Sequence, residues 1–290
     1  MKKHQKNSMK NKLAILAVLG AVAIGAYFVY ANRFEIQQDL ASSDVPEAVT
    51  FEEVVNRLPE TGGDEPVPEL VEYRSNTTDS TYIPEPEPVS EPVAEADSTV
   101  NAVNLAVPFT SQAPHGNWSL PYQEACEEAS VLMAVSYFDS NLVDLSTPSS
   151  ADAAILDIVK FQVDEYQLYL DTTAEETARF ANAKFPGYYF NVIYDPTVEA
   201  IKTSLTNGSP VIVPAAGRKL GNPFFTGDGP PYHMILVRGF TESSFVTNDP
   251  GTRHGEGYVY SQDVIMNAMG DWNNGDPGNG RKAIIVVTKR

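Results

Sequence analysis

The stretch Ser111–Phe138, SQAPHGNWSLPYQEACEEASVLMAVSYF, contains Cys126, the only cysteine in the 290-residue chain. Polar and turn-forming residues precede this cysteine, and an almost wholly apolar run follows Glu128. Such a run predicts a helix from about Gln123 to Phe138 that is buried at the centre of a domain. The thiol therefore stands where a loop enters a buried helix, and it serves either as a small hydrophobic side chain or as a nucleophile.

Further helices and then a series of short strands are predicted after this helix. Helices are expected at 149–169, 174–185, 196–207 with Asp195 as its cap, and 262–269. Strands are expected at 188–194, 211–213, 233–240, 245–248, 257–260 and 283–288. Helices followed mainly by strands predict an α+β domain over residues 101–290, in which the helices pack against an antiparallel sheet.

The N-terminal end of the chain has the pattern of a membrane anchor. Residues 1–12 contain five lysines, and the run Leu13–Ala31, LAILAVLGAVAIGAYFVYA, carries no charge. A helix of this length spans a hydrocarbon core of about 30 Å, and the lysines before it predict that residues 1–12 stay in the cytoplasm. A cleaved signal peptide ending at Ala31 is the alternative, although the apolar run is longer than a signal core. The globular domain is expected outside the cytoplasm, either anchored by a single span or secreted.

Residues 32–100 are predicted to form an acidic, proline-rich, disordered linker between the anchor and the domain. Within it, Thr50–Leu58 has the pattern of a short helix, with Thr50 as cap and Glu53 completing a capping box. The sequence Leu58–Gly62, LPETG, matches a cell-wall sorting signal. More acidic linker follows it instead of an apolar segment, so we interpret this match as a coincidence.

The composition excludes several classes of function. A formal net charge of −18 and a pI near 4.5 argue against a nucleic-acid partner, which requires clustered Lys and Arg. One cysteine permits no intramolecular disulfide, and a free thiol kept in an oxidising compartment suggests a use. His115, His233 and His254 lack the spacing of a zinc set with Cys126, so no metal or other cofactor is expected. We expect a monomer.

Two residues have the chemistry that a nucleophilic thiol requires. His233 begins the apolar strand HMILV after a loop rich in glycine and proline, and Asp249 follows the next strand in Asn248–Thr252, NDPGT. A hairpin would place the Asp249 carboxylate beside the imidazole, where it could accept the Nδ1–H. Taken singly, His233 is as consistent with a core histidine, and NDPG with an ordinary turn.

The order of these residues resembles that of the papain-fold cysteine peptidases, and most closely the bacteriocin-processing (double-glycine leader) peptidase-like family. The likeness covers about residues 106–288. Its motifs are VPFTSQ at 107–112, PYQEACEEAS at 121–130, YHMILVRG at 232–239 and NDPG at 248–251.

The resemblance implies a role for each site residue. Cys126 would be the nucleophile, His233 the general base and then general acid, and Asp249 the group that orients His233. Gln112 matches the family's glutamine before the cysteine, whose side-chain amide donates to the oxyanion beside the Cys126 N–H. Gln123 is a second candidate for that donor.

The chain departs from the family pattern at two places. Relatives commonly have glycine after the cysteine, whereas here Glu127 and Glu128 follow, and carboxylates close to a thiol disfavour the thiolate. Glu127 would escape this conflict by pointing to the mouth of the cleft, where it could bind a basic group of the substrate. A phosphate-binding motif is also missing from the sequence, so the transporter ATPase often fused to leader peptidases is not encoded here.

These observations predict a membrane-anchored, extracytoplasmic cysteine peptidase that acts on peptides or proteins through Cys126, His233 and Asp249. The loop 216–232 is expected to form a wall of the cleft, with Phe224 and Phe225 as apolar contacts. A catalytically silent domain that binds peptide or cell-wall ligands is one alternative. An amidase or transpeptidase with the same triad is another.

Overall fold

In a computed structural model of the chain, which describes residues 22, 24–57, 100–167 and 170–290, the strands form one antiparallel sheet. Its strand order is β2-β7-β3-β4-β5-β6, and the short β1 pairs with the end of β4. The strands are β1 Val103–Asn104, β2 Tyr188–Tyr194, β3 Val211–Ala215, β4 His233–Phe240, β5 Ser244–Asn248, β6 Tyr258–Ser261 and β7 Ala283–Lys289.

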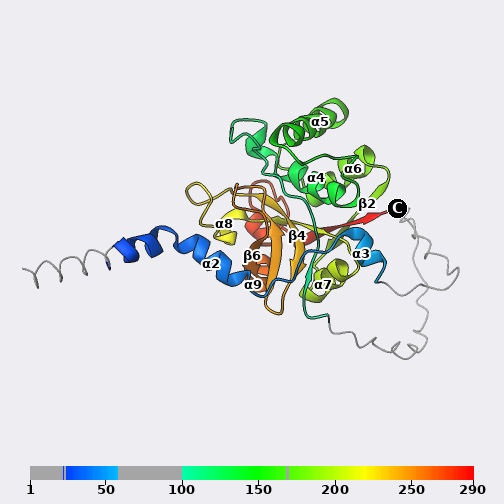
Figure 1. The fold of residues 1–290 in the computed structure, drawn as a ribbon. Coiled ribbons are helices and arrows are strands. Elements are labelled where there is room, and N and C mark those ends of the chain that lie inside the picture. The colour runs from blue at the N-terminus through cyan, green and yellow to red at the C-terminus, as the bar shows by residue number, and fades with distance from the viewer. Residues whose placement is uncertain (1–21, 23, 58–99, 168–169) are drawn as a thin grey trace, which may run out of the picture.

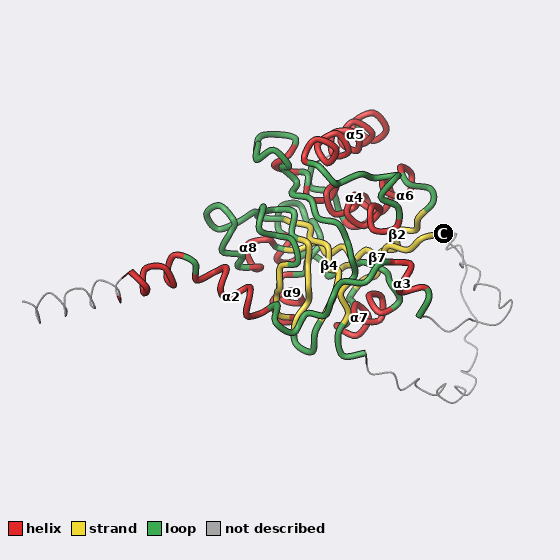
Figure 2. The backbone as a smooth tube through the Cα atoms, in the orientation of Figure 1, coloured by secondary structure: helices red, strands yellow, loops and turns green. Residues whose placement is uncertain are grey.

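Helices cover both faces of the sheet (Figures 1 and 2). They are α2 Arg33–Ala41, α3 Phe51–Val55, α4 Cys126–Phe138, α5 Pro148–Tyr166, α6 Ala174–Lys184, α7 Val198–Thr206, α8 Gly217–Leu220 and α9 Gln262–Ala268, with 3-10 turns η1 Tyr122–Glu124 and η2 Pro277–Asn279. The predicted α+β arrangement is therefore confirmed, with the helices of the first half packed against an antiparallel sheet.

The sequence of the central strand β4 does not alternate between polar and apolar residues, because the strand is covered on both faces. It contacts α4 and α7, which lie on opposite sides of the sheet, and all eight of its residues are buried. A strand covered on both faces needs a continuous apolar run instead of an alternating one. Every residue of α4 is buried as well, as the apolar run after Glu128 predicts for all but the first turn.

Side-chain caps fix where the helices begin. Thr147 caps α5 and Thr173 caps α6, each as half of a capping box. The cap predicted for α7 is wrong: Thr197 accepts a hydrogen bond from the Ala200 N–H, whereas Asp195 lies outside the helix with a positive φ. The helix consequently starts at Val198, two residues later than predicted.

Residues 33–57 belong to the folded domain, although the sequence assigned them to the linker. α3 has the predicted Thr50–Glu53 capping box, and Val54 is buried in the main core. Val49 pairs with Leu105 across a parallel bridge, which holds this segment beside β1. The composition of this segment suggested a linker because only a few apolar residues stand among many acidic ones. Three of them, Val49, Phe51 and Val54, are nevertheless enough to pack the segment against the core.

The two outer strands of the sheet are each paired with a side-chain amide. On β6, Gln38 of α2 donates to the Val259 carbonyl at 3.3 Å and accepts from the Val259 N–H at 2.9 Å. On β2, Asn182 of α6 donates to the Phe190 carbonyl at 3.0 Å and accepts from the Phe190 N–H at 3.1 Å. Each amide thus takes the place of a neighbouring peptide group.

Several predictions fall on the part of the chain that the structure does not describe. The anchor at 13–31 lies largely there, as do the LPETG sequence and most of the proline-rich linker. Among the described residues, no helix combines the length and the apolar character needed to cross a membrane.

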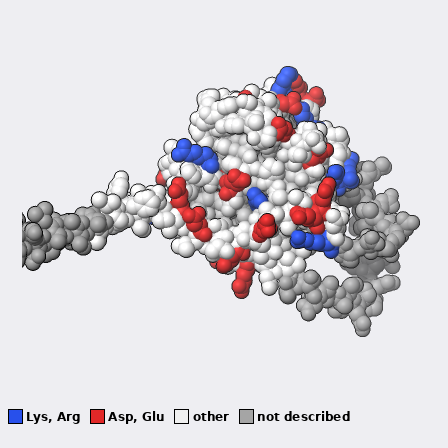
Figure 3. Space-filling view, in the orientation of Figure 1, with Lys and Arg blue, Asp and Glu red and all other residues white. Residues whose placement is uncertain are grey.

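Charged side chains are dispersed over the face drawn in Figure 3, where Lys and Arg stand apart from one another among Asp and Glu. Some form exposed ion pairs, such as Arg281 with Asp195 at 2.8 Å, and such pairs contribute little to stability.

Candidate active site

Cys126 is the first residue of α4 and follows the 3-10 turn η1. Its side chain is 6% exposed and faces the start of β4, where the Met234 N–H donates to Sγ at 3.3 Å. The backbone N–H of Cys126 is free of any intrahelical acceptor, because the first N–H groups of a helix have none. The loop-to-helix junction predicted from the sequence is therefore where the thiol lies.

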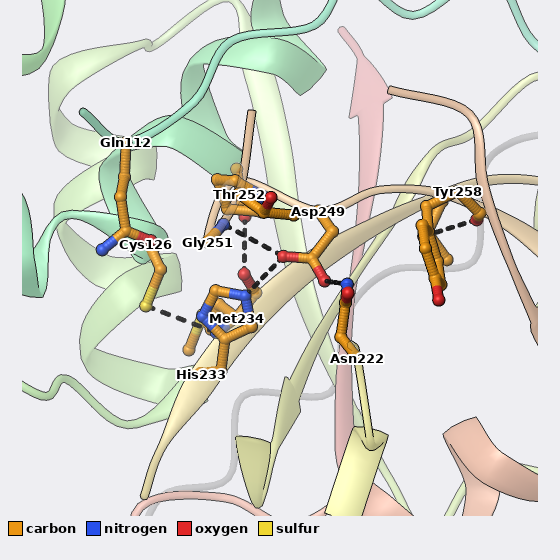
Figure 4. A network of polar contacts seen from close by, with 12 residues as sticks. Gln112, Cys126, Asn222, His233, Met234, Asp249, Gly251, Thr252 and Tyr258 are labelled. Carbon is orange, nitrogen blue, oxygen red and sulfur yellow. Dashed lines mark hydrogen bonds and ion pairs between the residues drawn. The ribbon is translucent and has the colours of Figure 1, made fainter. Parts of the chain in front are cut away.

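His233 and Asp249 meet on the sheet as the hairpin argument predicts. β4 and β5 are antiparallel neighbours in which Asn248 pairs with Leu236, so the chain after β5 runs back toward the start of β4. His233 Nε2 lies 2.8 Å from Asp249 Oδ1, and both side chains are buried. The bonded nitrogen is Nε2 and not the expected Nδ1. The carboxylate approaches the far side of the ring, which leaves Nδ1 toward Cys126 (Figure 4).

Three further donors hold the Asp249 carboxylate. Asn222 Nδ2 and Tyr260 OH donate to Oδ2 at 3.0 and 2.6 Å, and the Gly251 N–H donates to Oδ1 at 3.0 Å. Burial alone would raise the pKa of Asp249, but the charge of His233 and these hydrogen bonds outweigh it. The pKa of Asp249 therefore lies below its ordinary value, and the carboxylate stays ionised beside the imidazole.

The thiol of Cys126 has a second neighbour that competes with His233. Sγ donates to Glu127 Oε2 at 3.0 Å, and among the described residues its hydrogen bonds are to Glu127 and Met234. Burial, followed by the charge and the hydrogen bond of Glu127, raises the pKa of Cys126 well above its usual value. In this arrangement the thiol is protonated.

Glu127 and Glu128 are both buried, with exposed fractions of 2% and 1%. Glu127 Oε1 accepts from the Thr172 N–H at 3.1 Å, and Glu128 accepts from the Gln162 side chain. The alternative in which Glu127 points to the mouth of the cleft is therefore wrong, and its conflict with the thiolate stands. The first turn of α4 faces the protein interior on every side, so neither carboxylate reaches solvent.

Gln112 lies beside the site, but its side-chain amide is engaged. Nε2 donates to the Tyr122 and Gln123 carbonyls at 2.9 and 3.0 Å, which ties the loop at Gln112 to η1. The side chain of Gln123 is exposed and also lines the cleft. Both glutamines are close enough to the cleft to remain candidates, and the oxyanion role of Gln112 stays a prediction.

A cleft of about 1240 Å³ opens over Cys126 and His233. Phe224 and Phe225 line it, which confirms that the loop 216–232 forms one wall. Phe225 packs edge-on against the His233 ring, with 5.4 Å between centroids, while Phe224 stacks on His254. Trp118 also lines the cleft and is 44% exposed, so it belongs to the cleft and not to the core.

Sequence reasoning did not identify three groups of this site, which are Asn222, Tyr260 and the Met234 N–H. It identified Glu127 as a neighbour of the thiol but not as a buried one. Asn222 and Tyr260 lie far from Asp249 in sequence and carry no motif that would point to them. The hydrogen bond from the Gly251 N–H could have been predicted from the sequence, because Asn-Asp-Pro-Gly predicts a turn whose aspartate accepts from a nearby N–H. In the part of the chain that is described, no three His, Cys, Asp or Glu side chains are grouped so that they could hold a metal ion.

Comparison with known proteins identifies the family. The model of the Peptidase_C39 like family matches residues 104–276, which is more than half of the chain, and the chain belongs to this family. The likeness to papain-fold cysteine peptidases is thereby confirmed. A crystal structure from Bacillus anthracis that is described as C39-like is 16% identical, with a TM-score of 0.43, and covers 65% of this chain and 98% of its own. No curated protein matches the sequence.

Proposed function

We propose that the protein is a cysteine peptidase that hydrolyses peptide bonds with Cys126 as nucleophile, His233 as base and Asp249 as its orienting group. One observation carries this proposal: the His233 imidazole lies between the Cys126 thiol and the Asp249 carboxylate at the floor of a cleft. Membership of a C39-like peptidase family supports the same reaction class.

The reaction follows from this order of groups. His233 Nδ1 takes the proton of the Cys126 thiol, and the thiolate attacks the peptide carbonyl carbon. The imidazolium then protonates the leaving amine, which gives an acyl-enzyme that water hydrolyses with His233 again acting as base. Asp249 accepts from Nε2–H throughout, so it fixes the ring and stabilises its positive charge.

The oxyanion of the tetrahedral intermediate requires preorganised donors. The N–H of Cys126 at the start of α4 is one such donor. Gln112 or Gln123 is the second, and a comparison of Gln112→Ala with Gln123→Ala separates the two. A loss of about 10²-fold in kcat is expected for the residue that donates to the oxyanion.

Labelling of the thiol by iodoacetamide, together with peptide cleavage, tests the proposal. Wild type should be labelled and active, Cys126→Ser neither, and His233→Ala labelled at least tenfold more slowly at pH 6. His115→Ala is the matched control, because His115 is exposed and does not belong to the pair. Equal labelling rates for wild type and His233→Ala would refute the proposed pair.

A domain that binds peptides without turnover is the second candidate. The protonated thiol beside Glu127 favours it, since a thiol with a raised pKa is a poor nucleophile. Peptide binding without products, by both wild type and Cys126→Ala, would support this candidate. Transfer of the acyl group to an amine, as in an amidase or transpeptidase, is distinguished from hydrolysis by the products.

For the whole chain we propose a monomer anchored by residues 13–31, with the domain outside the cytoplasm and peptides or proteins as substrate. The lysine-rich segment 1–12 and the uncharged run after it support this orientation. Protease added to intact cells should degrade the domain, and full protection of the domain would contradict the orientation.

A further inference from the structure

Cys126 Sγ has two neighbouring groups that can take its proton. Glu127 Oε2 is 3.0 Å away and accepts the thiol hydrogen, while the His233 ring turns Nδ1 toward the same sulfur (Figure 4). The Met234 N–H fixes the sulfur from the strand below at 3.3 Å. The proton of the thiol is thus directed toward the carboxylate and away from the imidazole.

Glu127 is held in place by groups that leave its charge uncompensated. Its only described hydrogen bonds are with Cys126 and the Thr172 N–H, and the salt bridges within the described residues do not involve it. The ionisable groups that face it are Cys126, Glu128 of α4, Asp171 from the segment before α6, and Tyr232 from the segment before β4.

This surrounding makes the proton occupancy of Glu127 sensitive to pH near neutrality. Burial is the largest cause, the Asp171 charge acts in the same direction, and the Cys126 and Thr172 hydrogen bonds oppose both. Together they raise the pKa of Glu127 to about 7. The raised pKa is what burial alone would produce, because a buried carboxylate without a cation beside it prefers its neutral form.

We propose that Glu127 is a further catalytic residue, a proton switch that makes the Cys126 thiolate available when the carboxyl group is protonated and holds the thiol protonated when it is ionised. This inference rests on the proposed function, whose nucleophile it regulates.

Each proton that moves in the switch has a defined source and destination. In the active form Glu127 has gained one proton from solvent and donates it in a hydrogen bond to Sγ. The S–H bond breaks, its proton forms the Nδ1–H bond of His233, and a thiolate–imidazolium pair remains. In the inactive form the Glu127 proton returns to solvent, and the thiol keeps its own proton because two adjacent negative charges repel each other.

The pH dependence of iodoacetamide labelling between pH 5.5 and 8.5 tests the switch on the full chain. E127Q copies the protonated carboxyl group, since its amide donates without ever ionising. Its labelling rate at pH 8 should exceed that of wild type at least tenfold, whereas at pH 5.5 the two should agree within about threefold. E128Q is the matched control, a second buried carboxylate that does not touch Sγ, and its labelling rate at pH 8 should rise much less than that of E127Q.

Asp171→Asn provides a milder variant at a partly exposed position. Without the Asp171 charge the pKa of Glu127 falls, so the loss of labelling should begin at lower pH than in wild type. This result would support the switch even if E127Q does not fold.

The outcomes separate this inference from the proposed function. Identical pH profiles for wild type, E127Q and Asp171→Asn, with His233→Ala still slow, would overturn the switch and leave the Cys126–His233 pair intact. Equal rates for wild type and His233→Ala would overturn both.

Discussion

Asp249 shows how the surroundings of one residue set the chemistry of its neighbour. Its carboxylate is buried and still ionised, because Tyr260, Asn222 and the Gly251 N–H supply the hydrogen bonds that water would otherwise provide. An ionised Asp249 keeps His233 oriented toward the thiol. The role of each donor can therefore be measured through the pH dependence of the reaction.

Tyr260→Phe should shift the acid limb of kcat/KM to higher pH by about one unit. The change removes a 2.6 Å hydrogen bond to the ionised carboxylate, so the pKa of Asp249 rises toward its ordinary value. The measurement is a pH profile of peptide cleavage between pH 4 and 8. Tyr258→Phe on the same strand is the control, because the hydroxyl that donates to the Asp249 carboxylate is that of Tyr260 and not that of Tyr258. An unshifted acid limb would show that Tyr260 does not tune Asp249.

At the residue scale, the sequence predicted which residues meet and missed how they bond. The order of the residues in the chain, and the hairpin that joins two of them, were enough to predict that Cys126, His233 and Asp249 meet. The choice of Nε2 depends on the side from which the carboxylate reaches the ring, and the burial of Glu127 depends on what surrounds the first turn of α4. Neither is encoded locally.

At the scale of elements, α3 illustrates the same division. The Thr50–Glu53 capping box predicted this helix, since both partners are local. Its docking was not predictable, because Val54 packs against Gly208 from the end of α7. Gly208 has φ +78°, and a Cβ there would lie 2.9 Å from Val54 Cγ1, so both the backbone angle and the close approach require glycine.

Val54→Ala should lower the free energy of unfolding by roughly 1.5 kcal/mol, because it removes two buried carbon atoms from the core. Urea denaturation of the full chain, followed by circular dichroism, measures this loss. Val55→Ala is the matched control, since Val55 is the next residue and is 47% exposed. If both variants lose the same stability, α3 does not dock as described.

At the scale of the whole molecule, the two buried carboxylates should set how stability depends on pH. Burial raises the pKa of Glu127 and of Glu128, so the folded state keeps protons that the unfolded state has lost. The free energy of unfolding should therefore fall as pH rises from about 4.5, their unfolded value, to 7 and above. Asp249 acts in the opposite sense. Its lowered pKa stabilises the folded state, and this stabilisation is lost only as the pH falls far enough to protonate the carboxylate.

Urea midpoints at pH 5 and pH 8 measure this effect. Wild type should be more stable at pH 5, and E128Q should show a smaller difference between the two values. Glu128 serves here because it is not part of the proposed catalytic machinery. Equal stability of wild type at both pH values would contradict the raised pKa values of the buried pair in the folded state.

The amides on the two outer strands have a consequence for self-association. An open sheet normally ends in unsatisfied peptide groups that recruit further strands, and a chain with two such ends could polymerise. Gln38 and Asn182 occupy one peptide group at each end, and so discourage growth into fibres in either direction. Light scattering should reveal faster aggregation of Gln38→Ala and Asn182→Ala than of the exposed control Gln37→Ala.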